Sequence, residues 1–244
     1  MAEQFKKIAF LAPRPGMTDA AFRKYWREVH GPLVAASHGY QTYRHRYVQN
    51  HLVAAGPLGG AVAFSGMAEF WLPRDNEDDF AATPIYRDRI RVDEMRFIDM
   101  DNTVSMSAVE TIVKPGHGPA KLVVLSRRRP GLGPADFQGG VSSAYRLAML
   151  GAPGVGDRIL GWTVNQVVEG SFRLPGGRMT GALPIDCIEV MWFGSSAEAS
   201  AAFGSDGYLQ TVRPIAQQLF AGESCQSFLA EELVFFDGGR PVAP

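Results

Sequence analysis

His30, His51 and Glu69 are the side chains best suited to chemistry, because imidazole and carboxyl groups can transfer protons at neutral pH. His30 lies in YWREVHGPLV, directly before a Gly-Pro pair. His51 ends the polar stretch YRHRYVQNH, and Glu69 lies within the apolar stretch GMAEFWL. This part of the sequence therefore favours general acid/base chemistry.

His30 has two interpretations. The segment TDAAFRKYWREVHG predicts a helix with Thr18 as its N-cap and apolar side chains at helical spacing. We expect the helix to end at Gly31 and Pro32, which places His30 on its last turn. There the histidine either caps free carbonyls and interacts with the helix dipole, or it is an acid/base group at the mouth of a pocket.

The elements around His30 include an unusually polar strand, predicted for YRHRYVQNHLV (43–53). Alternation places Tyr43, His45, Tyr47, Gln49 and His51 on one face, and Arg44, Arg46, Val48 and Asn50 on the other. Buried polar groups need partners, so such a strand suits the wall of a ligand cavity. We expect Tyr47 and Asn50 to orient a substrate oxygen, whereas Arg44, His45 and Arg46 fit a solvated end of the sheet.

Glu69 belongs to a second predicted strand and also has two interpretations. A carboxylate on an inner strand either pairs with an arginine or has a raised pKa suited to acid/base work. In the second case, Glu69 or His51 would assist departure of a leaving group.

The sequence carries no recognisable metal or nucleotide motif. His45 and His51 are six positions apart on a strand, a separation of roughly 20 Å, and no HxH, HxxxH or HxxE spacing occurs. The glycine-rich stretches GHGPA and GAPGVG do not join a strand to a helix as phosphate binding requires. We therefore predict no metal and no cofactor.

The amino-acid composition excludes several classes of protein. The chain has 244 residues, a net charge of -1 and two cysteines, Cys187 and Cys225. Nucleic acids and anionic membranes attract clustered positive charge, which is missing here, and no apolar run is long enough to span a bilayer. We expect a cytoplasmic protein whose partner is a small-molecule substrate.

The sequence also contains an internal repeat. IAFLAPRPGMTDAAF (8–22) resembles LVVLSRRRPGLGPADF (122–137) at an offset of 115, and GMAEFWL resembles CIEVMWF at an offset of 121. We infer a tandem duplication with domains at 1–114 and 119–244, joined near VKPGHGPA, and an insertion in the second copy within 173–184. Each copy has the predicted element order βαββαβ, typical of a ferredoxin-like fold.

The first half resembles the EthD family. RPGMTDAAFRKYWREVHGPLV, RYVQNHLV, SGMAEFWL and VDEMRFIDMDN carry the resemblance, which includes the family's tryptophan and His-Gly-Pro at Trp26 and 30–32. It implies an α+β fold in which two tandem ferredoxin-like units form a dimeric α+β-barrel arrangement within one chain. It also implies a cavity with Trp26 and Tyr43 among its substrate-binding residues, and it is compatible with a homodimer.

The second copy departs from this pattern. The offset of 115 places Tyr145 where the first copy has His30, and Gln166 where it has His51. We therefore expect the first copy to be active and the second to be a structural partner, with the place beside Tyr145 filled or apolar.

These residues lead us to predict a cofactor-independent lyase acting on a small aromatic or lactone-like molecule. His30 would move a proton while Glu69 or His51 assists the leaving group. The alternatives are an isomerase or cyclase, a cofactor-free monooxygenase of the same fold, and a non-catalytic ligand-binding or accessory protein.

Overall fold

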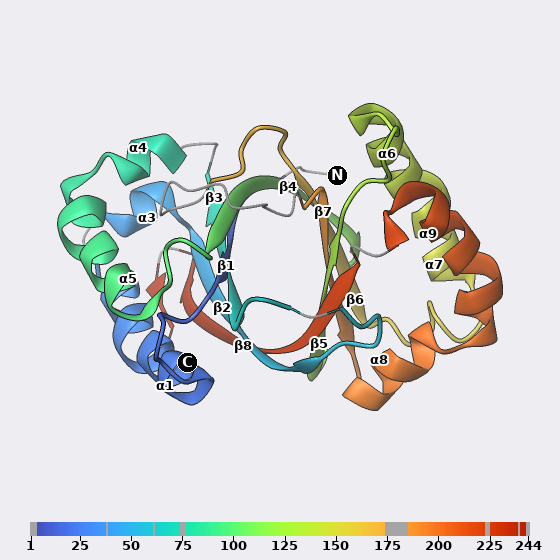
Figure 1. The fold of residues 1–244 in the computed structure, drawn as a ribbon, viewed down its shortest axis with the longest axis horizontal. Helices are drawn as coiled ribbons and strands as arrows, with labels where there is room; N and C mark the ends of the chain where they lie inside the picture. The colour runs from blue at the N-terminus through green and yellow to red at the C-terminus, as the bar shows by residue number, and fades with distance from the viewer. Residues whose placement is uncertain are drawn as a thin grey trace.

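Eight strands form one closed antiparallel barrel, and helices pack on two opposite sides of it (Figure 1). The structure is a computed structural model that describes residues 4–37, 39–60, 62–73, 77–173, 185–222, 225–238 and 240–242. The insertion expected within 173–184 lies, apart from residue 173, outside the described residues. No helix in the described ranges is both long enough and apolar enough to cross a membrane.

The barrel strands follow the order β2-β3-β1-β4-β6-β7-β5-β8, and β8 pairs with β2 to close the ring. A short β9 (Arg240–Pro241) adds to the end of β8. The barrel strands are β1 (Gln4–Leu11), β2 (Arg46–Ala55), β3 (Gly66–Leu72), β4 (Val104–Lys114), β5 (Ala120–Ser126), β6 (Gly161–Val167), β7 (Cys187–Phe193) and β8 (Gln226–Asp237).

The prediction of two tandem ferredoxin-like units with facing sheets was wrong. The two halves share a continuous hydrogen-bonded wall, because β4 pairs with β6 over 108–114 and β2 pairs with β8 over 46–55. An open sheet leaves a row of unpaired backbone groups at each edge, and closure into one barrel satisfies them. The sequence pattern shows which residues form strands, but it does not show which strand edges join.

The helices of the first half cover one side of the barrel and those of the second half the other (Figure 1). The first group is α1 (Asp19–Tyr25), η1 (Trp26–His30), α2 (Gly31–Ala35), α3 (Tyr40–Tyr43), α4 (Glu77–Ala81), η2 (Tyr86–Ile90) and α5 (Arg91–Phe97). The second is α6 (Pro134–Gly140), η3 (Val141–Tyr145), α7 (Arg146–Gly151), α8 (Ser196–Phe203), η4 (Tyr208–Val212) and α9 (Arg213–Leu219).

The first helix begins as predicted but continues past its expected end. Thr18 accepts a hydrogen bond from the N–H of Ala21 at 3.2 Å and caps α1. A π-helical turn, η1, then precedes Gly31 and Pro32, and the helical path runs on to Ala35. The wider turn gives room for the proline ring, which would otherwise clash with a carbonyl of the preceding turn.

His30 therefore lies inside a helical run, and the prediction that it sits on a last turn was wrong. The backbone groups near it are engaged within the helix, so its side chain is not needed as a cap.

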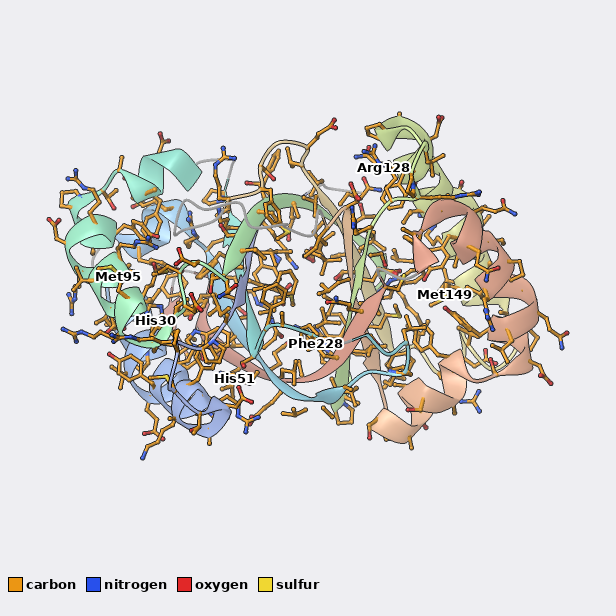
Figure 2. The ribbon with its side chains drawn as sticks, in the orientation of Figure 1. His30, His51, Met95, Arg128, Met149 and Phe228 are labelled. Atoms are coloured by element: carbon orange, nitrogen blue, oxygen red, sulfur yellow. The ribbon has the colours of Figure 1, made fainter. Side chains whose placement is uncertain are left out.

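The core is divided by the barrel wall into a lumen and two outer layers. Side chains of alternate residues face the two sides of each strand. The lumen holds Phe228, which lies near the centre of the molecule, while Met149 lies in the layer under the second-half helices (Figure 2). The layer under the first-half helices contains Phe22, Trp26 and Phe97.

Candidate functional site

A cavity lies between the barrel wall and the first-half helices, and His30 borders it. Its volume is about 100 Å³, and β1, β3, η1, η2 and α5 all contribute to its lining. The lining combines apolar and aromatic side chains with side chains that carry polar groups: Lys7, His30, Tyr40, Arg44, Tyr86, Glu94, Thr103 and Ser105. A cavity that combines apolar walls with converging polar groups is the usual form of a small-molecule site.

His30 is held in place by a carboxylate from the neighbouring helix. Its Nδ1 lies 2.8 Å from Oδ2 of Asp93, and its ring packs against Phe97 with the centroids 4.9 Å apart. The Tyr25 hydroxyl donates to the other carboxylate oxygen, Oδ1, at 2.7 Å. Both His30 and Asp93 are buried. The contacts fix the direction of the imidazole ring relative to the cavity.

Asp93 is ionised in this arrangement. Burial acts to raise its pKa, but the hydrogen bonds from His30 and Tyr25 outweigh burial and hold the pKa below its ordinary value. An ionised carboxylate on Nδ1 orients the imidazole and stabilises its protonated form. No described residue bonds Nε2 of His30, so that nitrogen is the one available to a molecule in the cavity.

Glu94 brings a second carboxyl group to the same cavity. Burial raises its pKa, although His30, Arg91 and the hydroxyl of Tyr86 all act in the opposite direction. The Tyr86 hydroxyl donates to Oε2 at 3.2 Å. A raised pKa favours the protonated form, which can give a proton to a substrate oxygen.

The predicted site residues Trp26 on η1, and Tyr47 and His51 on the outer face of β2, form a separate buried network with Gln49. Trp26 donates from Nε1 to the hydroxyl of Tyr47 at 3.1 Å, and Gln49 donates to the same hydroxyl at 2.9 Å. His51 lies 2.8 Å from the amide oxygen of Gln49, and its ring packs on Trp26. Burial, with help from two nearby arginines, lowers the pKa of His51 to about 3, so it is neutral at pH 7. None of these four residues borders the cavity.

Glu69 and Asn50 point into the lumen, on the opposite side of the wall. Glu69 pairs with Lys6 at 2.7 Å and with Lys121 at 3.0 Å, and it accepts a hydrogen bond from Asn50 at 2.9 Å. Burial alone would raise its pKa, but the two lysines lower it far below the ordinary value. Of the two interpretations offered by the sequence, the structure therefore shows the paired one, with lysines in place of the expected arginine.

Tyr43 and Arg44 do not lie where the sequence pattern predicts. Tyr43 lies on α3 and packs against Phe80, with ring centroids 5.4 Å apart, and it does not border the cavity. Arg44, expected at a solvated sheet end, is only 2% exposed and does border it. The expectation failed because the chain forms a helical turn at 40–43, so β2 begins only at Arg46.

Sequence reasoning missed Asp93, Glu94 and Tyr25. The sequence does contain a signal for the two acids. The helical repeat places Tyr86, Ile90 and Phe97 on one inward-packing face of a helix, and that face also includes position 93 or 94. Two consecutive acidic residues, Asp93 and Glu94, thus fall on or beside the buried face between Ile90 and Phe97, where a structural helix usually has an apolar side chain. The pairing of Asp93 with His30, 63 residues apart, has no sequence signal.

Comparisons with known proteins support the family and the fold. Residues 14–101 match the family model of the EthD domain. A candidate monooxygenase from Lactobacillus acidophilus NCFM is similar in structure, with a TM-score of 0.54, 8% identity and 99% of each chain covered. An anthrone oxidase-like protein has a TM-score of 0.54 at 12% identity, covering 95% of this chain and 93% of the other.

A candidate chlorite dismutase has a TM-score of 0.53 at 10% identity, covering 95% of this chain and 96% of the other. No curated protein matches the sequence. At identities this low, the likeness establishes a shared fold and leaves the reaction to be argued from the site.

Proposed function

We propose that the cavity beside His30, within the stretch that matches the EthD domain, is the active site of a lyase acting on a small aromatic or lactone-like molecule. The observation that carries this proposal is the oriented imidazole: Asp93 holds Nδ1, no described residue bonds Nε2, and His30 borders the cavity. A histidine oriented by an ionised carboxylate is a common general base.

In the elimination step, Nε2 of His30 takes a proton from a substrate carbon, and the C–H electron pair forms the new double bond. The bond to the leaving oxygen breaks, and that oxygen takes its proton from Glu94. Asp93 stabilises the imidazolium that forms. Each positioned acid or base of this kind contributes roughly 10²- to 10⁴-fold in rate.

Positive charge at the cavity supports the same chemistry. Lys7 and Arg44 are both part of its lining. A substrate carbonyl gains negative charge when the carbon beside it loses a proton, and a nearby cation stabilises that charge. The two cations therefore favour substrates in which the acidic C–H lies next to a carbonyl, as in a lactone.

The same groups would serve an isomerase, in which the proton returns to a different carbon and nothing leaves. The two reactions differ in what happens to the proton of Glu94. In an elimination this proton is transferred to the leaving oxygen in every turnover, whereas an isomerisation has no leaving oxygen. Identification of the products therefore separates the lyase from the isomerase, and a cavity that binds without turnover would be an accessory ligand-binding site.

Benzisoxazole is a suitable test substrate, since a base removes the C–H of its isoxazole ring, the N–O bond breaks, and the oxygen takes up a proton to give 2-cyanophenol. In solution this phenol ionises, and its phenolate absorbs in the near ultraviolet. We expect the wild-type protein to accelerate this elimination above the buffer rate. His30→Gln should lower the protein-catalysed rate by about 100-fold or more. Glu94→Gln should also lower it, because a carboxamide cannot protonate the leaving oxygen.

His117→Gln is the matched control, because this exposed histidine meets the ring of Trp192 edge-to-face and does not border the cavity. It should keep the wild-type rate. A His30→Gln protein that folds normally and retains full activity would rule out His30 as the base.

A further inference from the structure

The second half contains a larger cavity in the equivalent place. Its volume is about 450 Å³, and it lies between β5, β7, η4 and α9, with Tyr145 at the position that the offset of 115 assigns to His30. The place beside Tyr145 is therefore open rather than filled, and polar side chains such as Glu189 and Arg213 join the apolar ones in its lining. The π-helical turns η1 and η3 differ by the same offset, so the two helices approach the barrel alike.

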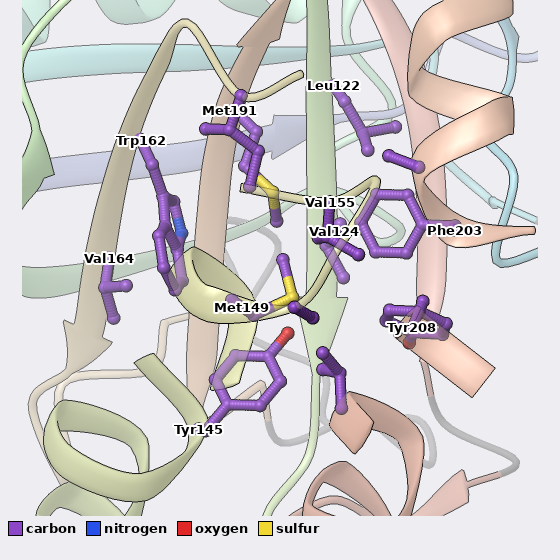
Figure 3. Packing of buried hydrophobic residues seen from close by; sticks show 14 of the residues in the cluster. Leu122, Val124, Tyr145, Met149, Val155, Trp162, Val164, Met191, Phe203 and Tyr208 are labelled. Atoms are coloured by element: carbon purple, nitrogen blue, oxygen red, sulfur yellow. The ribbon is translucent and has the colours of Figure 1, made fainter. Parts of the chain in front are cut away.

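A carboxyl group lies at the floor of this cavity. Glu189 on β7 is 1% exposed, and its Oε2 accepts a hydrogen bond from the hydroxyl of Tyr145 at 3.2 Å. The other oxygen, Oε1, has no hydrogen-bond partner among the described residues. Figure 3 shows Tyr145 between Trp162 and Tyr208 in this layer. A buried carboxyl oxygen without a partner at a cavity is the kind of group that a ligand satisfies.

The surroundings of Glu189 favour its neutral form. Burial raises its pKa to about 7, against the opposite effects of Tyr145 and Trp162. No lysine or arginine forms an ion pair with it in the described part of the chain. The other titratable or charged groups around it are the uncharged Cys187, Cys225 and Tyr208, and Arg213 at the exposed rim.

The neutral carboxyl has one hydrogen-bond donor, and the contact with Tyr145 leaves Oε1 as the oxygen free to carry it. Since Oε2 accepts from Tyr145, the proton belongs on Oε1, which then lacks an acceptor. A carbonyl oxygen of a ligand would satisfy it. The walls that such a ligand would meet are largely apolar, including Val124, Phe203 and Phe220.

We propose that this cavity is a second small-molecule site, which binds an uncharged aromatic ketone or aldehyde through a hydrogen bond from Glu189 Oε1. An anion would be repelled by the ionised form of Glu189, which is present around pH 7. A cation would require Glu189 to lose its proton first. The site is independent of His30, because the closed barrel separates the two helical layers.

The test uses fluoroacetophenone as the probe and ¹⁹F NMR titration of the whole protein. Ala216→Trp places a large ring in the cavity from α9, and it should weaken binding at least tenfold. Ala201→Trp is the matched control: this alanine is exposed on α8 and does not border the cavity, so affinity should stay at the wild-type value. Unchanged binding in Ala216→Trp would overturn the proposal.

A pH series tests the role of Glu189 without depending on Ala216→Trp. Above pH 7 the donor is lost in proportion to ionisation, so the apparent affinity of the wild type should fall by tens of fold between pH 6 and 9. Glu189→Gln keeps a donor at every pH, and its affinity should not change over that range. A pH-independent wild type, or tighter binding of fluorobenzylamine than of the ketone, would contradict the proposed ligand class.

Discussion

Replacing Glu189 with glutamine should make the protein more stable, and increasingly so as the pH rises. The pKa of Glu189 is raised by burial from an ordinary 4.5 to about 7. The native state therefore binds this proton more tightly than the unfolded chain does. Between pH 4.5 and pH 7 the unfolded chain gives up the proton first, so the free energy of unfolding falls as the pH rises.

The size of the effect follows from the same two values. At about 1.4 kcal/mol for each tenfold change in proton affinity, the ionised form at pH 8 costs the native state about 3 kcal/mol relative to pH 4.5. Glutamine stays neutral at every pH, and its amide oxygen can still accept from Tyr145. Wild type and Glu189→Gln should thus be nearly equal at pH 4.5 and differ by about 3 kcal/mol at pH 8.

Urea unfolding at pH 4.5, 6, 7 and 8, followed by tryptophan fluorescence, measures this difference. Only the difference between the two proteins is interpreted, because other groups contribute equally to both. Glu169→Gln is the control, since Glu169 is exposed and its replacement should give a difference that does not grow with pH. A constant difference between wild type and Glu189→Gln from pH 4.5 to 8 would refute the reasoning.

Three further outcomes are expected. Glu69→Gln should lower the free energy of unfolding at pH 7 by about 1–3 kcal/mol, because it removes the carboxylate that Lys6 and Lys121 share, while Glu110 and Glu232 still pair with the two lysines. That loss should shrink as the pH falls below 4.5, since the unfolded chain then takes up a proton at residue 69 while the native carboxylate, whose pKa is lowered, stays ionised; urea titrations at pH 7 and pH 2 measure it. Gly31→Ala should cost about 1–3 kcal/mol in thermal unfolding, because a β-carbon there would collide with Phe235 and Gln49, whereas Gly139→Ala, in open space on α6, should not destabilise. Asp93→Asn should lower the rate of benzisoxazole elimination while fluoroacetophenone binding in the second-half cavity stays unchanged, and equal loss of both would point to a folding defect instead.

Several features of this protein can be predicted from its sequence because they depend on residues that are close together along the chain. The Thr18 cap needs only residues within one helical turn, and it formed as expected. The two faces of residues 46–51 follow from the strand repeat, which places Gln49 and His51 outside the barrel and Asn50 inside it. The resemblance of the first half to the EthD domain could also be recognised from local motifs, one of which contains His30, and residues 14–101 match the model of that domain.

The tertiary structure decided what those groups do. Asp93 meets His30 only because two helices pack together on one side of the barrel, and Lys121 reaches Glu69 only because strands from both halves close one ring. Glu189 differs from Glu69 in its partners, since one is buried beside a tyrosine and the other between two lysines. Both lie in strands of similar composition, GMAEFWL and CIEVMWF. Their pKa values move in opposite directions because burial and charge are set by residues far away in the chain.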